Sequence, residues 1–164
     1  MSPITNFPPE LFAEICSFLP PSDLFNLSQV CRKFYGYLCD PNSFTTQQIW
    51  KKSRLHFVPK EDIPRPEGMG ETKYAELLMI EQGCQVCKQV MRCKIYWDFE
   101  VRCCKECFFK KTVTELDNYP KELFDIMPYV IYDNERYYWI EQIDYAYFHS
   151  YGLSEDILPI LIRW

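Results

Sequence analysis

Two pairs of cysteines are the residues whose type and spacing point most clearly to chemistry. Cys84 and Cys87 form one C-x-x-C pair, Cys104 and Cys107 form a second, and residues 88–103 separate them. Four thiolates at such a spacing suit a tetrahedral Zn²⁺ ion, with Zn–S distances of about 2.3 Å. The sequence therefore predicts one bound zinc ion, with reduced cysteines in a hydrophobic core as the alternative.

The second pair could begin at Cys103 or at Cys104, and the pattern of the preceding residues favours Cys104. Apolar and polar residues alternate from Cys93 to Cys103, as in a strand with one apolar face. Cys93 and Cys103 both fall on that face, whereas Cys104 lies outside the alternation. A hairpin turn within residues 88–103 would change this assignment of faces.

The predicted zinc is structural. Catalytic zinc commonly has three protein ligands and an open position, whereas four cysteines close the coordination shell. The two histidines, His56 and His149, lie far from both pairs in the sequence. A RING-type ligase module would need about eight ligands for two zinc ions. No Ser/His/Asp or Cys/His nucleophile arrangement and no glycine-rich phosphate loop is visible, so we expect a protein that is not an enzyme.

Cysteine usage and the distribution of apolar residues predict the compartment. The chain has nine cysteines, an odd number, and no Lys or Arg among residues 1–19 that would suit a secretory signal. No segment reaches the roughly 20 apolar residues of a membrane span. We therefore expect a soluble protein of the cytoplasm, the nucleus or both, without a membrane partner.

Charge is uneven along the chain. Residues 84–111 contain seven basic and three acidic residues, whereas residues 112–164 contain three basic and ten acidic residues. The basic segment offers a possible contact with nucleic acid, with aromatic rings nearby. The acidic flanks oppose it, because they repel phosphate. The residues considered for this contact are Arg92, Lys94, Arg102, Lys105, Lys110 and Lys111, with Tyr96 and Trp97.

Short helices must come before this cysteine-rich segment. Pro8-Pro9 and Pro20-Pro21 each suit a helix boundary, and Ser22 is the predicted N-cap of a second helix. Large apolar residues recur at helical spacing through residues 11–38, and a further short helix is expected around Phe44–Trp50. Helices shorter than roughly 12–15 residues are marginal alone, so either this chain or another protein must cover their apolar stripes.

The residues at spaced positions of this segment, taken in their order along the sequence, resemble an F-box. They are Phe7-Pro8-Pro9-Glu10-Leu11-Phe12, Ile15, Phe18-Leu19, Asp23-Leu24, Leu27, Val30-Cys31-Arg32-Lys33-Phe34, Leu38 and Trp50. Phe7 stands where leucine is commoner. The resemblance covers about residues 4–50 and implies a three-helix motif that docks onto the Skp adaptor of an SCF (Skp–cullin–F-box) ubiquitin ligase. The implied Skp-binding residues are Phe7, Pro8, Leu11, Ile15, Leu19, Leu24, Leu27, Val30, Cys31 and Phe34.

Two further resemblances concern the cysteine-rich segment. Arg102-Cys103-Cys104-Lys105-Glu106-Cys107 is similar to an R-x-C-x-x-C element of fungal F-box proteins, with Cys104 as the implied ligand. The two cysteine pairs and the later sequence YYWIEQID loosely resemble the zinc subdomain of damage-recognition proteins in nucleotide-excision repair. That likeness covers few positions, and it is the basis of the nucleic-acid alternative.

The C-terminal third is rich in aromatic residues. Strands are expected at residues 112–114 and 137–140, and a helix at residues 141–151 that ends at Gly152. Most of the aromatic rings are expected to pack in a core. The last residues, 157–164, are apolar, which suits either a docked helix or a chain cut from a longer product.

Together these observations predict an α+β protein. We expect an F-box helical domain at residues 1–58, a linker with a short helix at 59–83, and a zinc-ribbon or treble-clef-like module with an aromatic-rich extension at 84–164. The predicted function is an F-box adaptor that binds Skp and, through it, the cullin scaffold, and that presents an unknown protein substrate through the zinc module. The alternatives are a zinc-ribbon nucleic-acid-binding protein with purely structural N-terminal helices, and an F-box protein that binds Skp without a ligase role.

Overall fold

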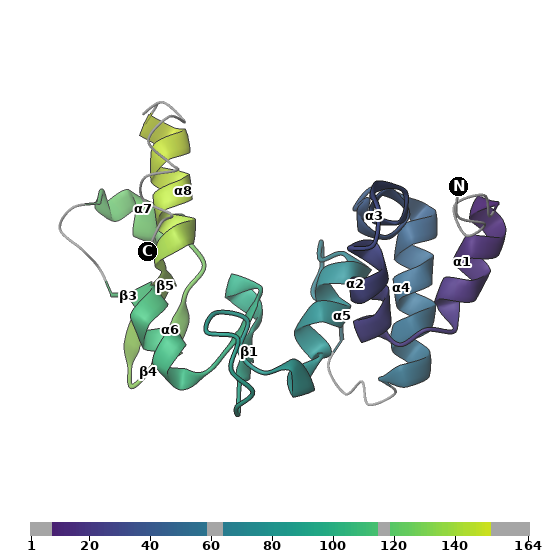
Figure 1. The fold of residues 1–164 in the computed structure, drawn as a ribbon. Helices are drawn as coiled ribbons and strands as arrows, with labels where there is room; N and C mark the ends of the chain where they lie inside the picture. The colour runs from purple at the N-terminus through teal and green to yellow at the C-terminus, as the bar shows by residue number, and fades with distance from the viewer. Residues whose placement is uncertain (1–7, 59–63, 115–118, 152–164) are drawn as a thin grey trace. The chain divides into compact units, whose positions relative to one another are not determined.

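The computed structural model describes residues 8–58, 64–114 and 119–151. The chain divides into two compact units, Met1–Gln82 and Gly83–Trp164 (Figure 1). Phe7, Gly152 and residues 157–164, which entered the predictions above, lie outside the described residues. None of the helices seen in the described ranges combines the length and apolar composition that crossing a bilayer would take.

The first unit is helical. Its helices are α1 (Pro9–Ser17), α2 (Pro21–Ser28), α3 (Arg32–Cys39), α4 (Phe44–Phe57) and α5 (Glu71–Leu78), and a 3-10 turn, η2 (Ile80–Gln82), ends it. Proline stands in the first turn of α1 and of α2, where a backbone N–H would have no partner within the helix, so its absence costs no hydrogen bond. The prediction that Ser22 caps the second helix is wrong, because Pro20 is the N-cap and α2 begins at Pro21.

Helix α4 is longer than the short helix expected around Trp50. The hydroxyl of Ser43 accepts a hydrogen bond from the Thr46 N–H at 3.3 Å and caps its first turn. No proline or glycine follows until Pro59, so the helix continues through Lys51 and Lys52 to Phe57. Its buried residues include Ile49, Trp50 and Ser53, which face the other helices.

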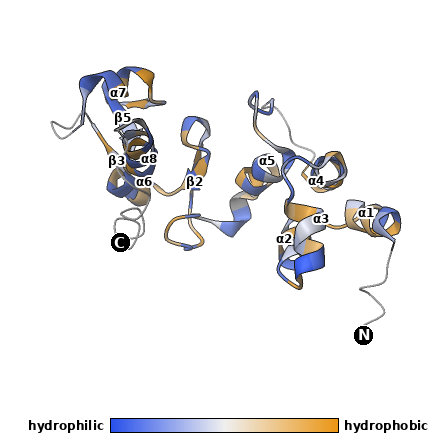
Figure 2. Cartoon of the chain, turned by 90° about the horizontal axis from the view of Figure 1, so that it is seen from above, coloured by the Kyte–Doolittle hydropathy of each residue, from blue (hydrophilic) through white to orange (hydrophobic). Residues whose placement is uncertain are grey.

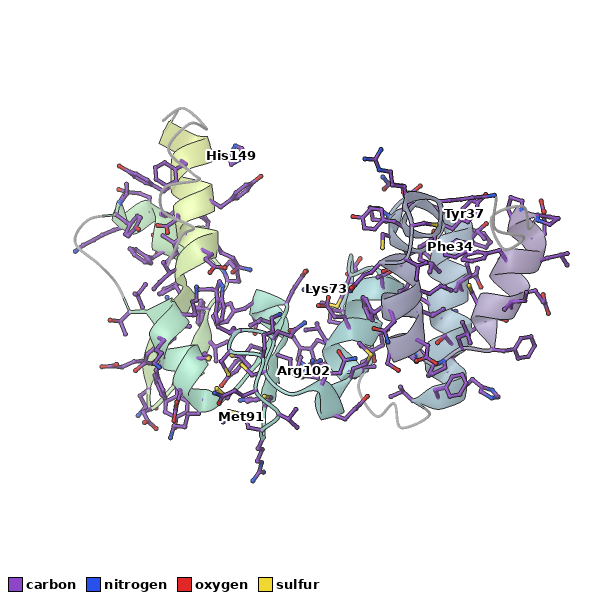
Figure 3. The ribbon with its side chains drawn as sticks, in the orientation of Figure 1. Phe34, Tyr37, Lys73, Met91, Arg102 and His149 are labelled. Carbon is purple, nitrogen blue, oxygen red and sulfur yellow. The ribbon has the colours of Figure 1, made fainter. Side chains whose placement is uncertain are left out.

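The apolar stripes of these helices meet in one core. The rings of Phe12 and Phe34 stack at 4.7 Å between centroids, and Phe34 and Tyr37 project from α3 toward α1 (Figure 3). Trp50 is fully buried, and its indole N–H donates to the Leu38 carbonyl at 2.7 Å. Hydrophilic and hydrophobic residues are mixed along these helices (Figure 2).

Helix α5 is attached to α4 by a buried ion pair. The Arg54 Nε lies 2.9 Å from the Glu71 carboxylate, and the two side chains are only 5% and 8% exposed. The Arg54 guanidinium also stacks over the Tyr74 ring, and Ala75 joins the core of the preceding helices. Residues beyond α4 are therefore part of the same hydrophobic unit.

Replacing Arg54 with methionine is expected to lower the free energy of unfolding of this unit by up to about 3–5 kcal/mol, because the buried Glu71 carboxylate would lose its close partner and retain the longer ion pair with Arg65, at 3.6 Å. Urea denaturation followed by circular dichroism measures this loss. The double variant Arg54→Met/Glu71→Leu is the matched control, since it removes both charges and should recover most of the lost stability. Equal loss in the single and double variants would contradict the argument.

The second unit begins with the first cysteine pair and a hairpin. Strands β1 (Lys94–Tyr96) and β2 (Val101–Cys103) are antiparallel, and the 3-10 turn η3 (Trp97–Phe99) joins them. The expectation of one alternating strand from Cys93 to Cys103 is therefore wrong. Glu100, with φ of 53°, makes the left-handed step into β2. Because the chain reverses, Tyr96 and Arg102 are buried although the alternation placed both on a polar face.

A short helix, a second sheet and two further helices complete the unit. The elements are α6 (Lys105–Lys111), β3 (Thr112–Val113), α7 (Lys121–Ile126), β4 (Val130–Tyr132), β5 (Glu135–Trp139) and α8 (Ile140–Tyr151). The antiparallel sheet has the order β3-β5-β4. Asp133 and Asn134 both have positive φ, as the turn between β4 and β5 requires for a right-handed twist. The strands expected near residues 112 and 137 and the helix from residue 141 are thus confirmed.

Aromatic packing fills both cores of this unit, as expected for most of the rings. Tyr96 stacks on Phe108 at 4.4 Å between centroids, beside the buried cysteines. Tyr138 is fully buried against Phe124, with Ile143 of α8 in the same cluster. The described residues therefore form an α+β chain, helical first and with small antiparallel sheets in its second half.

Candidate metal centre and helical docking surface

The structure brings together the four cysteines predicted as ligands. Cys84 and Cys87 lie in the loop before the hairpin, Cys104 is the N-cap residue of α6, and Cys107 lies in the first turn of that helix. Their sulfur atoms all lie within 4.8 Å of one another. Sulfurs around a tetrahedral zinc are about 3.8 Å apart, as follows from the Zn–S bond length. The arrangement could therefore hold a metal ion with little movement.

Backbone amides prepare this cluster for negative charge. The Cys84 Sγ accepts hydrogen bonds from the N–H groups of Cys87 and Cys104, each at 3.4 Å. Burial raises the pKa of Cys84, but hydrogen bonds from the backbone N–H groups of Cys87, Cys104 and Val86 and from the Cys87 thiol outweigh it and lower the pKa from 9.0 to about 6. Burial and the neighbouring sulfurs raise the pKa of Cys107 instead. Opposite shifts of two pKa values are expected where thiols are too close to ionise together without a cation.

Cys103 and Cys93 remain outside the cluster. Cys103 is fully buried in the core around Phe108, and burial raises the pKa of its thiol to about 12. The Cys93 thiol donates to the Met91 carbonyl at 3.3 Å. The geometry agrees with the choice of Cys104 over Cys103, although the reason differs: Cys104 precedes a helix, and Cys103 ends a hairpin strand.

Residue types and spacing did not predict the contacts that attach the first cysteine pair to the hairpin. The Arg102 Nε donates to the Gly83 carbonyl at 2.8 Å, and the Gln85 N–H donates to the Arg102 carbonyl at 2.9 Å. Gly83 has a φ of +71°, and a Cβ there would lie 2.2 Å from the Gln89 oxygen. Arg102 belongs to the R-x-C-x-x-C element noted above, which was the available signal for its role (Figure 3).

The structure leaves fewer basic and aromatic residues exposed for a contact with nucleic acid than the sequence suggested. Arg102 is 2% exposed and faces the protein interior, so counting it among surface cations is wrong. Lys111 forms an ion pair with Glu141 at 2.6 Å. Tyr96 is buried in the core and is not available for stacking on a base.

Helix α1 and its C-cap residue Phe18 present an apolar face that the described residues of the first unit leave exposed. Leu11, Ile15 and Phe18 follow one another at helical spacing and are 53%, 50% and 66% exposed. On the opposite face of α1, Phe12 and Cys16 are buried in the core. Isolated exposed apolar residues are ordinary, but three on one helical face are typical of an interaction surface.

The residues implied as Skp-binding divide into two groups in the structure. Leu24 and Phe34 are buried in the core of this structure, whereas a residue in a partner contact is expected to be exposed, so their part in Skp binding stays a prediction. They fall on the inner faces of α2 and α3, which the sequence pattern could not tell from the outer faces. The others among the described residues are exposed or partly exposed: Pro8, Leu11, Ile15, Leu19, Leu27, Val30 and Cys31.

Comparisons with known proteins support an F-box in the first unit. Residues 4–52 match the family model described as F-box-like. A 49-residue stretch, 30% of this chain, is 45% identical to F-box only protein 31 of Xenopus tropicalis. The match spans 8% of the length of that relative. No solved structure is significantly similar to the chain. The predicted F-box region is thus confirmed, and the family match ends before the cysteine-rich unit.

Proposed function

We propose that this protein is an F-box adaptor that binds the Skp subunit of an SCF ubiquitin ligase. The observation that carries the proposal is the exposed apolar face of α1, at Leu11, Ile15 and Phe18, within the region that matches the F-box-like family. Helices of the adaptor would cover this face, as in other contacts between an amphipathic helix and an apolar groove. The complex would act in the cytoplasm or the nucleus.

In this proposal the chain is not an enzyme. Its contribution to ubiquitin transfer is proximity, since it holds a substrate near the ubiquitin donor that the cullin scaffold positions. The second unit presents the protein substrate. Three of the four clustered cysteines are buried, and the cluster connects the loop before the hairpin with α6.

We further propose that Cys84, Cys87, Cys104 and Cys107 hold one structural Zn²⁺ in a treble-clef-like module. The support is the donor set: four thiols of suitable spacing, with two backbone N–H groups directed at Cys84. Zinc would supply the positive charge that lets all four thiolates coexist, and it would link the first loop to α6.

If zinc binds here, Arg102→Met should weaken its affinity by roughly 10- to 100-fold, the range seen when outer-shell partners are removed. The reason is that Arg102 holds the Gly83 carbonyl beside Cys84. Competition with a chromogenic chelator measures the change. Lys94→Met, on the paired strand and exposed, is the matched control and should bind zinc like the wild type. Equal affinities of the two variants would refute the role given to Arg102.

Co-expression with the Skp adaptor, followed by purification through a tag on this chain, tests the proposed function. A stoichiometric complex is expected, and elemental analysis of the same sample is expected to give one zinc per chain. Failure to form a complex in a sample that is folded and contains zinc would reject the adaptor function without affecting the metal proposal.

A further inference from the structure

Three aromatic rings stand at or near right angles to one another where the β4–β5 hairpin packs against α6 (Figure 1). The rings of Tyr132 and Tyr137 are 6.3 Å apart between centroids, with their planes at 90°. The Phe109 ring of α6 lies 5.1 Å from Tyr132 at 89° and 5.6 Å from Tyr137 at 75°. Both tyrosines lie on one face of the hairpin, because Tyr132 pairs with Glu135 and Val130 pairs with Tyr137. The three rings are named here the aromatic corner.

A positive charge of the chain itself lies on the aromatic corner. The Lys105 Nζ is 5.5 Å from the centroid of the Tyr132 ring and 5.8 Å from that of the Phe109 ring, over both rings. The same ammonium group donates a hydrogen bond to the Tyr132 hydroxyl. The faces of two perpendicular rings are therefore directed at one common point, and that point accepts an ammonium group.

The charges beside the aromatic corner also suit a cation. Asp133, in the hairpin turn, attracts the Lys105 ammonium. The Glu135 carboxylate accepts a hydrogen bond from the Tyr137 hydroxyl at 3.4 Å. Arg136 belongs to the opposite face of β5, because side chains alternate along a strand. The carboxylates on the side of the rings therefore favour a positively charged ligand over a negatively charged one.

The aromatic corner is open to solvent, and its present occupant is held weakly. The Lys105 side chain is exposed, Phe109 is 38% exposed, and both tyrosines are partly buried. The distances from Nζ to the two centroids are close to the limit of a cation–π contact, about 6 Å. A primary ammonium is strongly hydrated, whereas a methylated ammonium is less hydrated and covers aromatic rings with its methyl groups. Such a group is expected to displace Lys105 from the rings.

We infer that the aromatic corner binds a methylated ammonium group and that Lys105 occupies the corner until this ligand displaces it. Phe109 and Tyr132 contribute the ring faces that now contact the Lys105 ammonium, and Tyr137 contributes the third ring. A trimethyllysine side chain and choline carry the same chemical group, and the test below distinguishes these two sources. The inference does not depend on the adaptor function, which uses the first unit.

Ligand titrations followed by ¹H–¹⁵N NMR test the inference on the full, zinc-loaded chain. The probes are the N-acetyl amide of trimethyllysine, choline, the unmethylated lysine amide, and a neutral analogue in which carbon replaces the trimethylated nitrogen. Trimethyllysine is expected to shift the amide signals of Phe109 and Tyr132. The lysine and neutral probes should bind roughly tenfold more weakly, because one is more hydrated and the other lacks charge. The tighter binder of trimethyllysine and choline identifies the source of the group.

Protein variants locate the binding. Phe109→Leu keeps an apolar side chain but removes one ring, so it should weaken trimethyllysine binding roughly fivefold. Phe44→Leu, at a 77% exposed position of the first unit, is the matched control. Lys105→Ala should tighten binding roughly threefold or more, because it removes the competing ammonium. Lys110→Ala removes the same charge from an exposed position of the same helix and should bind like the wild type.

Zinc content and circular dichroism establish whether each variant is folded. If Phe109→Leu does not fold, Tyr132→Leu takes its place, with Tyr145→Leu at a 58% exposed position as the control. Failure of both trimethylammonium probes to bind, or equal binding of the neutral analogue, would overturn the inference. So would wild-type affinity in the ring variant or weaker binding by Lys105→Ala. Loss of ligand binding in a chain that still co-purifies with Skp would reject this inference alone, and the converse result would reject the adaptor function alone.

Discussion

Replacing Cys104 with serine is expected to abolish metal binding and to unfold the second unit, while the helices of the first unit remain folded. Cys104 is the N-cap residue of α6 and contributes one of the four clustered sulfurs, so the substitution removes a thiol that links the first cysteine pair to this helix. Structural zinc in small modules contributes an apparent binding free energy of about 10–16 kcal/mol, which is also folding free energy. Few single substitutions have a larger expected effect.

Zinc analysis together with ¹H–¹⁵N NMR spectra of the two units measures this result. Cys103→Ser is the matched control, because it changes the neighbouring cysteine, which lies outside the cluster. It should keep its zinc, although its buried hydroxyl will lower stability. Loss of zinc in Cys103→Ser with retention in Cys104→Ser would show that the ligand was assigned to the wrong residue.

The cluster should also respond to acid. Zinc ligands must be deprotonated, so zinc is expected to dissociate as the pH falls. In the metal-free chain, the lowered pKa of Cys84 stabilises the folded state. This contribution is fully present above pH 9.0, the ordinary pKa of the thiol. That contribution is lost as the pH falls through about 6. Both effects destabilise the second unit in acid, and thermal unfolding across a pH series can follow them.

Replacing Ile15 with aspartate is expected to abolish adaptor binding without unfolding the first unit. Ile15 is half exposed in the free chain, so the charge is tolerated there. In the proposed complex the same position is buried, and the loss of an isoleucine contact alone removes about 1.5–3 kcal/mol. Together with the desolvation of the carboxylate, the affinity for Skp should fall by roughly 100-fold or more.

Isothermal titration of purified Skp adaptor into each variant measures this loss. Val90→Asp is the matched control, because it places the same charge at an exposed apolar position of the second unit. Leu24→Asp provides the opposite case: Leu24 is fully buried, so this variant should lose its helical structure before binding is at issue. Wild-type affinity for Ile15→Asp would exclude the α1 face as the docking surface.

The sequence was sufficient for features that depend on residue type and local spacing. Proline pairs set the starts of α1 and α2, and the C-x-x-C pairs defined the cluster, because these signals need no knowledge of distant contacts. The alternation from Cys93 to Cys103 led to the wrong prediction of a single strand, since a hairpin and a single strand share the same local pattern. Only the pairing of Lys94 with Cys103 decides between them, and that is a tertiary fact.

Burial was the second feature that spacing could not determine. Leu24 and Ile15 occupy similar motif positions, yet one is fully buried and the other half exposed. Arg102 was counted as a surface cation by its charge alone, although its bond to Gly83 places it inside.

The buried contact of Arg54 with Glu71 separates two boundaries that are often treated as one. The F-box-like match ends at residue 52, whereas the packed unit includes Tyr74, Ala75 and Leu77 of α5. The segment that matches the family model is therefore shorter than the packed unit. A chain limited to residues 4–52 would cut α4 short, leave both Arg54 and Glu71 behind and remove Ala75 of α5 from the core. The matched segment and the packed unit of this protein thus have different lengths.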